Sequence, residues 1–277
     1  MKKFISPGGW FSLEYPSDWN EFENSEDTFL FYNPNHWNGN FRVSATMGRN
    51  VDYGKSCLND ELRENPTAVV SRIGKTGCVY SVETFQEGAA WFTTYFWMLD
   101  YGKICMECSF TTHKNGEKIF AEKIIQSIFV PKNKHYFNHE IIPIRILEVG
   151  EINAAFESVE KLVKKELSKD FTGIEKDLVK LQHLLDSANP KFQKKEVKEN
   201  IALAFGTILV NEMDGMEWFT LIEDKRECPV LCFEQSNIIV DPFAFIINKV
   251  KNDGSCDLTA EYNRIRQEVD EFLNLQK

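Results

Sequence analysis

The chain has 277 residues and a formal net charge of −10, from 32 basic and 42 acidic side chains. This length suits two domains that each bury a core, and an aromatic content of 13% excludes a mainly disordered chain. The negative charge argues against nucleic acid as a partner, because proteins that bind it gain affinity by neutralising phosphates with Lys and Arg.

Cysteine usage and the N-terminal residues predict a cytoplasmic protein. Seven cysteines are an odd number, which favours reduced thiols over a disulfide framework. Pro7, Gly8 and Gly9 interrupt the segment where the apolar run of a secretory signal would lie, and no segment approaches the ~20 apolar residues of a membrane span. We therefore expect no membrane partner; an export signal removed from this sequence is the alternative.

Residues 1–130 are predicted to form mainly strands, because apolar and polar residues alternate along them. The predicted strands are 11–15, 29–32, 41–47, 68–73, 78–85, 91–99 and 103–111, joined by turns rich in Gly, Asn and Pro. Helices are expected near 54–64 and from Glu117 onward, the second of them ended by Pro131. Consecutive hairpins of this kind imply an antiparallel sheet.

The segment WFTTYFWML, residues 91–99, contains no charged residue, Gly or Pro. Both faces of such a strand are largely apolar, so we predict a central strand that is covered on two sides, with its Trp and Phe side chains in the core. In the next strand the even-numbered residues of 104–110 share an apolar face. The odd-numbered face, which includes Cys105, is expected to be wetter.

The N-terminal half resembles the PsbP-like fold, an α/β sandwich that small Ran-GTPase-binding proteins also use. The resemblance rests on the opening GWFSLEYPSDW, in which an aromatic residue and a short strand precede Tyr-Pro, two residues and Trp. It rests also on the order of elements through residue 131, ending in a helix and a short apolar strand at 127–130. The resemblance implies the fold of residues 4–131 and, since members act mostly as binding or assembly proteins, a binding role by analogy.

After residue 150 the pattern becomes mostly helical. Apolar stripes and cap residues predict helices at 152–167, 174–187, 193–212, 241–251 and from 258 onward. Short strands are predicted at 218–222, 230–233 and 238–240, and Asp241-Pro242 is a helix start with Asp as the N-cap. This order resembles a bacterial domain of unknown function that follows a PsbP-like domain in some proteins, and the resemblance brings no functional residues.

The sequence thus predicts an α+β protein of two domains. Residues 1–137 form a PsbP-like antiparallel sheet with flanking helices, and residues 151–277 form a helix-rich domain with a small three-stranded antiparallel sheet. Residues 138–150 are a linker or connecting strand. Residues 1–140 have 14 basic and 17 acidic side chains, a net charge of −3. Residues 141–277 have 18 basic and 25 acidic side chains, a net charge of −7, so acidity is concentrated in the second domain.

No motif predicts catalytic residues, a metal site or a cofactor. Cys105 and Cys108 form a CxxC, but a separation of three places the two sulfurs on opposite faces of a strand. Both are therefore expected to be packing thiols, as are Cys228 and Cys232. A cysteine nucleophile needs an adjacent base, and none of the five histidines lies in a recognisable catalytic context.

Two pairs of residues outside the predicted core are candidate sites. His135 and His139 would supply half a metal site if their segment were helical, and solvated linker histidines are the alternative. His36 and Trp37 lie in the loop NPNHWNGN, residues 33–40, where a large exposed side chain favours binding of a partner. The alternative is that Trp37 folds back onto its own sheet.

The absence of catalytic motifs and the acidity together favour a non-catalytic cytoplasmic protein-binding role, like that of an immunity or adaptor protein. A negative surface would attract a basic protein partner by electrostatic steering. The alternative is a protein that binds a small molecule or lipid, or a hydrolase, with a pocket at the domain junction. A third possibility, a structural subunit, would require a large apolar interface.

Overall fold

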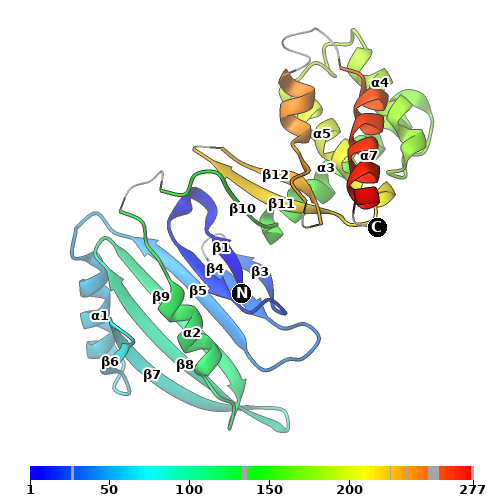
Figure 1. Cartoon of the computed structure of the whole chain (residues 1–277). Coiled ribbons are helices and arrows are strands. Elements are labelled where there is room, and N and C mark those ends of the chain that lie inside the picture. Colours follow the sequence, from blue (N-terminus) through cyan, green and yellow to red (C-terminus); the bar gives the residue numbers. More distant parts are fainter. Residues whose placement is uncertain (26–27, 133–135, 225, 235, 249–255, 276–277) are drawn as a thin grey trace. The chain divides into compact units, whose positions relative to one another are not determined.

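The computed structural model forms two compact units, Met1–Asn138 and His139–Lys277 (Figure 1). It describes residues 1–25, 28–132, 136–224, 226–234, 236–248 and 256–275. Each unit has its own hydrophobic core.

The first unit is built on a seven-stranded antiparallel sheet with the strand order β3-β4-β5-β9-β8-β7-β6. Its strands are β3 (Asn20–Ser25), β4 (Thr28–Tyr32), β5 (Asn40–Met47), β6 (Val69–Ile73), β7 (Thr76–Glu87), β8 (Ala90–Tyr101) and β9 (Ile104–His113). A separate two-stranded sheet pairs β1 (Lys2–Ile5) with β2 (Ser12–Tyr15), and a short 3-10 turn, η1 (Pro7–Gly9), connects them. The predicted antiparallel sheet is confirmed.

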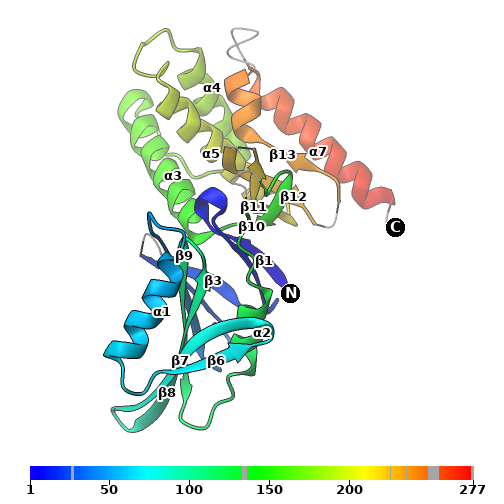
Figure 2. The same ribbon diagram turned by 90° about the vertical axis from the view of Figure 1, so that its left-hand side faces the viewer.

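Two helices cover opposite faces of this sheet, α1 (Tyr53–Glu64) and α2 (Ile119–Ser127) (Figure 2). On the α2 face, Trp97 and Leu99 of β8 are buried in the main core. Met98, which points the other way, is buried on the α1 face. The predicted central strand is therefore β8, and its C-terminal half is covered on both sides.

The other half of β8 differs from the prediction. Trp91 was expected in the core, but its side chain is 46% exposed and Lys114 lies over its ring at 4.8 Å. The physical reason is length, because a strand of twelve residues extends ~40 Å whereas a helix of twelve residues spans only ~18 Å. The two helices therefore leave one end of the long hairpin uncovered.

The N-terminal segments show three further differences from the prediction. The strands β1 and β3 were not expected, because each is short and carries several charged residues. The predicted strand at 127–130 is reduced to a single bridge between Ser12 and Phe129. Cys105 was expected on a wetter face but is only 1% exposed, because α1 covers the beginning of β9.

The described residues of the second unit form four α-helices and a four-stranded antiparallel sheet. The helices are α3 (Ile146–Leu167), α4 (Leu178–Asp186), α5 (Lys195–Glu212) and α7 (Leu258–Leu275), with a 3-10 turn, η2 (Glu175–Asp177), before α4. The sheet order is β10 (Glu140–Pro143), β11 (Met216–Glu223), β12 (Arg226–Phe233) and β13 (Ile239–Val240). The three predicted strands are present.

The segment predicted as a linker or connecting strand supplies the fourth strand. Residues of β10 pair with β11, with Ile142 opposite Thr220. The helix α3 also begins at Ile146, six residues before the predicted start, although Gly150 lies inside it. Burial of this segment against the sheet outweighs the low helix propensity of one glycine, which is only about 1 kcal/mol.

Helix α5 forms the centre of the second core. Almost every residue of 201–209 on it is buried, among them Phe205 and Leu209. Gly206 is required there, because a Cβ atom at this position would overlap the indole ring of Trp218 and lie 3.3 Å from Pro242. Close packing of α5 on β11 therefore depends on a residue without a side chain.

The predicted helix start at Asp241 is confirmed. The backbone N–H of Ala244 donates a hydrogen bond to the Asp241 Oδ1 at 2.8 Å, which is the bond that the side chain of an N-cap residue accepts. Pro242 follows at the first helical position. The segment continues as a π-helical turn, η3 (Ala244–Asn248). The predicted end of this helix near residue 251 lies outside the described residues. Among the helices that the structure describes, none is long and apolar enough to cross a bilayer.

Candidate functional site

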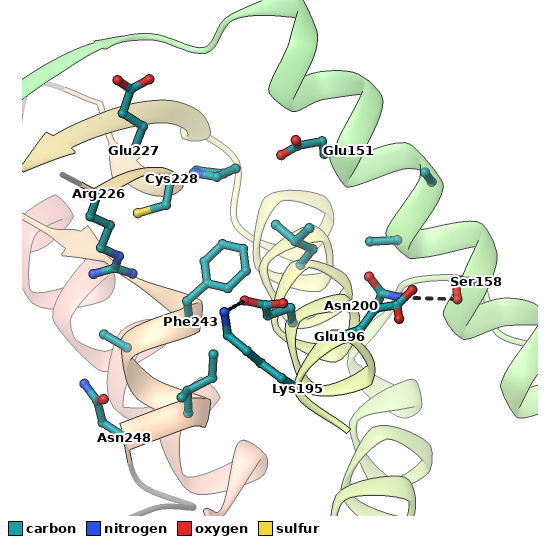
Figure 3. A pocket seen from close by; sticks show the side chains of 17 residues that line it. Glu151, Ser158, Lys195, Glu196, Asn200, Arg226, Glu227, Cys228, Phe243 and Asn248 are labelled. Atoms are coloured by element: carbon teal, nitrogen blue, oxygen red, sulfur yellow. Dashed lines mark hydrogen bonds and ion pairs between the residues drawn. The ribbon is translucent and has the colours of Figure 1, made fainter. Parts of the chain in front are cut away.

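A cavity of about 1030 Å³ lies within the second unit, between α3, α5, β12 and the π-helical turn (Figure 3). Its α3 wall consists of Glu151, Ala154, Ala155 and Ser158, a spacing that places all four on one face of a helix. Small residues dominate this wall, so the helix leaves room beside α5.

The α5 wall is polar and exposed or partly exposed in the first turns of the helix and becomes apolar and buried after them. Lys195, Glu196, Glu199 and Asn200 come from the first turns of the helix, and Leu203, only 5% exposed, follows them. The side-chain amide of Asn200 donates to the Ser158 hydroxyl at 3.3 Å and so joins the two helical walls (Figure 3).

The third side of the cavity comes from β12 and the π-helical turn. Arg226, Glu227, Cys228 and Pro229 line it from the strand, Phe243 lines it from just before the turn, and Ile247 is among the residues that line it from the turn. Phe243 packs against two clusters of buried side chains, one that contains Leu203 and one that contains Val230, so it links the cavity to both. Short π-helical segments, with hydrogen bonds between residues i and i+5, are frequent at functional sites.

Charge in the cavity is negative. Four glutamates and two basic residues line it, and both basic residues are already paired. The Lys195 Nζ lies 3.2 Å from the Glu199 carboxylate, and Arg226 forms a bidentate pair with Asp241 at 2.7 and 2.9 Å. Among the described residues, the carboxylates of Glu151 and Glu196 form no ion pair. These two carboxylates are therefore available to a positively charged ligand.

A buried arginine holds the remaining glutamate in place. Arg145 is 2% exposed, and its Nε donates to both carboxylate oxygens of Glu148 at 2.8 and 3.0 Å. Its Nη2 donates to Glu148 as well, and to the Oε2 of Glu227 at 2.8 Å. One guanidinium thus fixes two carboxylates, and the cluster of Arg145, Glu148 and Glu227 has a net charge of −1 beside the cavity.

The pKa of Glu151 is raised above its ordinary value. Partial burial of the carboxyl group is the main cause, and the negative charge of Glu148 adds to it, while Arg145 opposes both. A cationic ligand would favour the ionised form of Glu151, so ligand binding at this residue is coupled to loss of its proton.

Cys228 does not have the properties of a nucleophile. It is 7% exposed, and burial raises the pKa of its thiol to about 11, so the thiolate is scarce at neutral pH. No histidine is among the described residues that line the cavity. Cys232 is buried in the same cluster as Cys228 and Val230, and its pKa is likewise raised to about 11 by burial. The prediction of packing thiols is confirmed for this pair.

The loop candidates His36 and Trp37 belong to the first unit and do not line this cavity. The Trp37 ring packs edge-on against His113 at 4.8 Å and Phe92 at 6.0 Å, and its Nε1 donates to the Asn40 side chain at 2.6 Å. It is 37% exposed, as expected from the alternative in which it folds back onto its sheet. Binding of a partner at His36 and Trp37 stays a prediction.

The other candidates are placed as follows. Cys105 packs on the α1 face and Cys108 on the α2 face, so the two sulfurs of the CxxC are on opposite faces, as predicted. The Nδ1 of His139 lies 3.1 Å from the Glu223 carboxylate, while His135 lies outside the described residues. Within the part of the chain that the structure describes, no three His, Cys, Asp or Glu residues are grouped to hold a metal ion.

Sequence reasoning missed the cavity, because its walls are brought together by packing of elements that lie far apart in the chain. One signal was present. Between Glu151 and Ser158, the face of α3 that carries Ala154 and Ala155 has neither a large apolar nor a long charged side chain. Such a stretch of small residues on an otherwise charged helix indicates close approach or a hollow.

Comparison with known proteins identifies two family models on this chain. The first, a domain of unknown function (DUF3805), matches residues 1–153, and the second, a domain of unknown function (DUF3806), matches residues 177–262. The second match confirms the predicted resemblance of the C-terminal half to a bacterial domain of unknown function. No curated protein matches the chain.

Similar solved structures cover either the whole chain or its N-terminal half. A crystal structure from Bacteroides thetaiotaomicron VPI-5482 is 46% identical, covers 95% of this chain and 97% of its own, and has a TM-score of 0.88. The Ran-binding protein Mog1p of Saccharomyces cerevisiae is 9% identical over 47% of this chain and 94% of its own, with a TM-score of 0.31. PsbP from Synechocystis sp. PCC 6803 is 10% identical over 47% and 92%, with a TM-score of 0.26.

Proposed function

Because the chain belongs to the DUF3805 family, whose description gives no activity, we propose a function from its own residues: it is a non-catalytic protein-binding protein, like an immunity or adaptor protein. In this proposal the acid-lined cavity of the second unit accepts a positively charged side chain of a basic partner. The observation that carries it is the pair of glutamates, Glu151 and Glu196, that line the cavity without an ion pair among the described residues.

The chemistry of the cavity suits a long basic side chain. The methylene stem of a Lys or Arg would pack on the apolar surface of Leu203 and Phe243, while its charged head meets one of the carboxylates that line the cavity. Hydrogen bonds between such a head and a carboxylate are about twice as strong as those between neutral groups. Since residues 141–277 carry a net charge of −7, a basic partner would also be steered toward this unit from a distance.

A binding role is supported over catalysis because the side chains of the cavity that could act as nucleophiles are not activated. A hydrolase needs a nucleophile next to a base, and the candidate thiol in this cavity, Cys228, has its pKa raised to about 11 by burial. The hydroxyl of Ser158 accepts a hydrogen bond from Asn200, which is not a base. Neither side chain is activated for attack.

The second candidate function is binding of a small cationic molecule. Its support is the cavity volume, about 1030 Å³, which is at the upper end of the range for small-molecule sites. A polyamine would use the same two glutamates as a lysine side chain does. The two functions therefore differ in the ligand and share the site.

Capture from a lysate of the native host tests the proposal. We expect immobilised wild-type protein to retain a basic protein, more of it at low salt than at physiological salt, because screening weakens steering. The double variant Glu151→Gln/Glu196→Gln should retain much less. Glu166→Gln is the matched control, since Glu166 is an exposed residue of α3 outside the cavity.

The outcomes separate the candidates. Mass spectrometry that finds no retained protein at either salt concentration contradicts protein binding. Equal retention by wild type and double variant would show that the protein has a partner but that the partner does not bind in the cavity. If no protein is retained but spermidine raises the Tm of the wild type more than that of the double variant, the small-molecule function is favoured.

A further inference from the structure

Two cysteines from distant parts of the first unit lie close together. Cys57 lies on α1 and Cys105 on β9, and after burial the neighbouring Cys57 is the next cause that raises the pKa of Cys105. They belong to the same apolar cluster on the α1 face of the sheet, together with Met98 and Leu58. Their juxtaposition could not be predicted from the sequence, in which Cys105 has its CxxC partner at Cys108.

The backbone fixes this contact. The N–H of Gly54 donates to the Gly102 carbonyl oxygen at 2.8 Å, so the first turn of α1 is tied to the turn between β8 and β9. A Cβ atom on Gly54 would come within 2.8 Å of the Ile104 carbonyl oxygen, which shows how closely the helix approaches the strand. Cys57 follows Gly54 by three residues and therefore lies on the same face of the helix. It meets Cys105, the residue after Ile104.

Exposure distinguishes this pair from the other cysteines. Cys57 is partly exposed, whereas the other six cysteines are buried. Cys78 and Cys108 pack in the core on the opposite face of the sheet, so neither shares the cluster of Cys57. A soluble oxidant therefore reaches Cys57 before any other thiol, and the nearest thiol that can respond is Cys105.

From this geometry we propose that Cys57 and Cys105 form a reversible disulfide when the protein meets a peroxide. The Cys57 thiol is first oxidised to a sulfenic acid, and hydrogen peroxide is reduced to water. The Cys105 sulfur then attacks the Cys57 sulfur, the S–S bond forms, and the sulfenic oxygen leaves as a second molecule of water. In total, two thiols lose two electrons and two protons to one peroxide.

The two cysteines have separate roles in this reaction. Burial and the neighbouring Cys57 raise the pKa of Cys105, so little of this thiol is ionised at neutral pH, which protects Cys105 from direct oxidation. The same raised pKa makes its attack on the Cys57 sulfenic acid slow at neutral pH, and the disulfide should form faster as the pH is raised. Cys57 is the residue oxidised first and Cys105 resolves it. The bond would close a loop of about 48 residues and fasten α1 to the sheet, which restricts the unfolded chain.

Peptide mapping of the full-length protein tests the proposal. Reduced protein is treated with hydrogen peroxide, blocked with N-ethylmaleimide in denaturant and digested without reductant. We expect a linked pair of peptides containing Cys57 and Cys105, and an intact mass lower by about 2 Da before blocking. Dithiothreitol should restore both free thiols, and slower amide hydrogen exchange in residues 53–64 should accompany the oxidised form.

Two variants keep the test decisive. In Cys57→Ser, a conservative change at a partly exposed position, the linked pair should be absent and no other disulfide should replace it. Cys105→Ser should allow Cys57 to be oxidised further, to a sulfinic acid. The proposal is overturned if wild-type Cys57 is recovered as a sulfinic or sulfonic acid while Cys105 is blocked by N-ethylmaleimide, or if the disulfide joins other cysteines.

Discussion

Arg145 and Glu148 form a buried bidentate pair, with the Nε of the arginine donating to both oxygens of the carboxylate at 2.8 and 3.0 Å. Both residues are under 5% exposed, and they lie one helical turn apart at the start of α3. The same guanidinium reaches Glu227 on β12. This pair therefore ties a helix to a sheet and sets the position of a carboxylate that lines the cavity.

Removing the arginine alone should be costly. Arg145→Met would leave Glu148 buried without its partner, and breaking a buried pair in this way costs about 3 to 5 kcal/mol of unfolding free energy. Urea denaturation of the variant and the wild type measures this loss of unfolding free energy. Arg264→Met is the control, because Arg264 pairs with Glu261 and Glu268 while half exposed, and its loss should cost about 1 kcal/mol or less. Equal costs for the two variants would contradict the structural role of Arg145.

Asp177 should stabilise the second unit in a pH-dependent way. Its Oδ2 accepts hydrogen bonds from the backbone N–H groups of Thr172 at 2.7 Å and Gly173 at 2.9 Å. Burial alone would raise the pKa of Asp177, but the hydrogen bonds from Lys180 and the backbone outweigh burial, and the pKa is lowered. Asp177→Ala should destabilise the protein by about 1 to 3 kcal/mol at pH 7.

The sign of the pH effect follows from the lowered pKa. A carboxylate with a depressed pKa stabilises the fold above the unfolded pKa of about 3.9, and this stabilisation is lost as pH falls through the folded pKa. The difference in unfolding free energy between wild type and Asp177→Ala should therefore shrink as the pH is lowered below about 4. Urea titrations at pH 7 and pH 3 measure this difference, and a constant difference would show that the charge is unimportant.

Two glycines inside helices should respond in opposite directions to the same change. Gly206→Ala places a methyl group against Trp218 and should destabilise by about 1 to 3 kcal/mol through overpacking. Gly150→Ala meets nothing within 4 Å and should stabilise α3 by up to about 1 kcal/mol, because alanine has the higher helix propensity. Thermal unfolding checks both predictions: the Tm should fall in Gly206→Ala and rise in Gly150→Ala. A stable Gly206→Ala variant would mean that Trp218 can move away.

Residues 1–137 should fold without the rest of the chain. They contain the seven-stranded sheet and its complete core, and Phe137 is buried with Lys3 lying over its ring at 5.6 Å. We expect a cooperative thermal transition and dispersed amide signals for this fragment. A molten fragment, with exposed apolar surface and no cooperative transition, would show that the first core needs the second unit.

The period of apolar residues predicted most of the elements of both units, because burial on one face enforces that period. It predicted β8 as a strand inside the sheet, with both faces apolar, and it predicted the helices α2 and α5. It failed for Trp91, since an apolar strand pattern does not reveal how far the covering helices extend. It also failed at β10, where four residues pair with a strand about eighty positions later.

The candidate site was beyond sequence reasoning for a related reason. Glu196 follows Glu151 by 45 residues and Glu227 follows Glu196 by 31, and each looks like an ordinary surface charge in its own helix or strand. Only packing of α3 and α5 with β12 makes them line one cavity. Cys57 and Cys105 are a second example, because their contact depends on the close approach that Gly54 allows.

The most direct test of the proposed function is isothermal titration calorimetry with a lysine-rich peptide, using a glutamate-rich peptide of equal length as the control ligand. We expect binding of the lysine peptide alone, weaker by about tenfold or more in Glu151→Gln/Glu196→Gln, since the loss of even one charged hydrogen bond is worth about 1.4 kcal/mol or more. Binding should also weaken as the pH is lowered, and because the pKa of Glu151 is raised, this loss should begin at a higher pH than it would for an ordinary glutamate. Equal affinity of wild type and double variant for the lysine peptide, or equal affinity of the wild type for both peptides, would contradict an acidic cavity that recognises a basic partner.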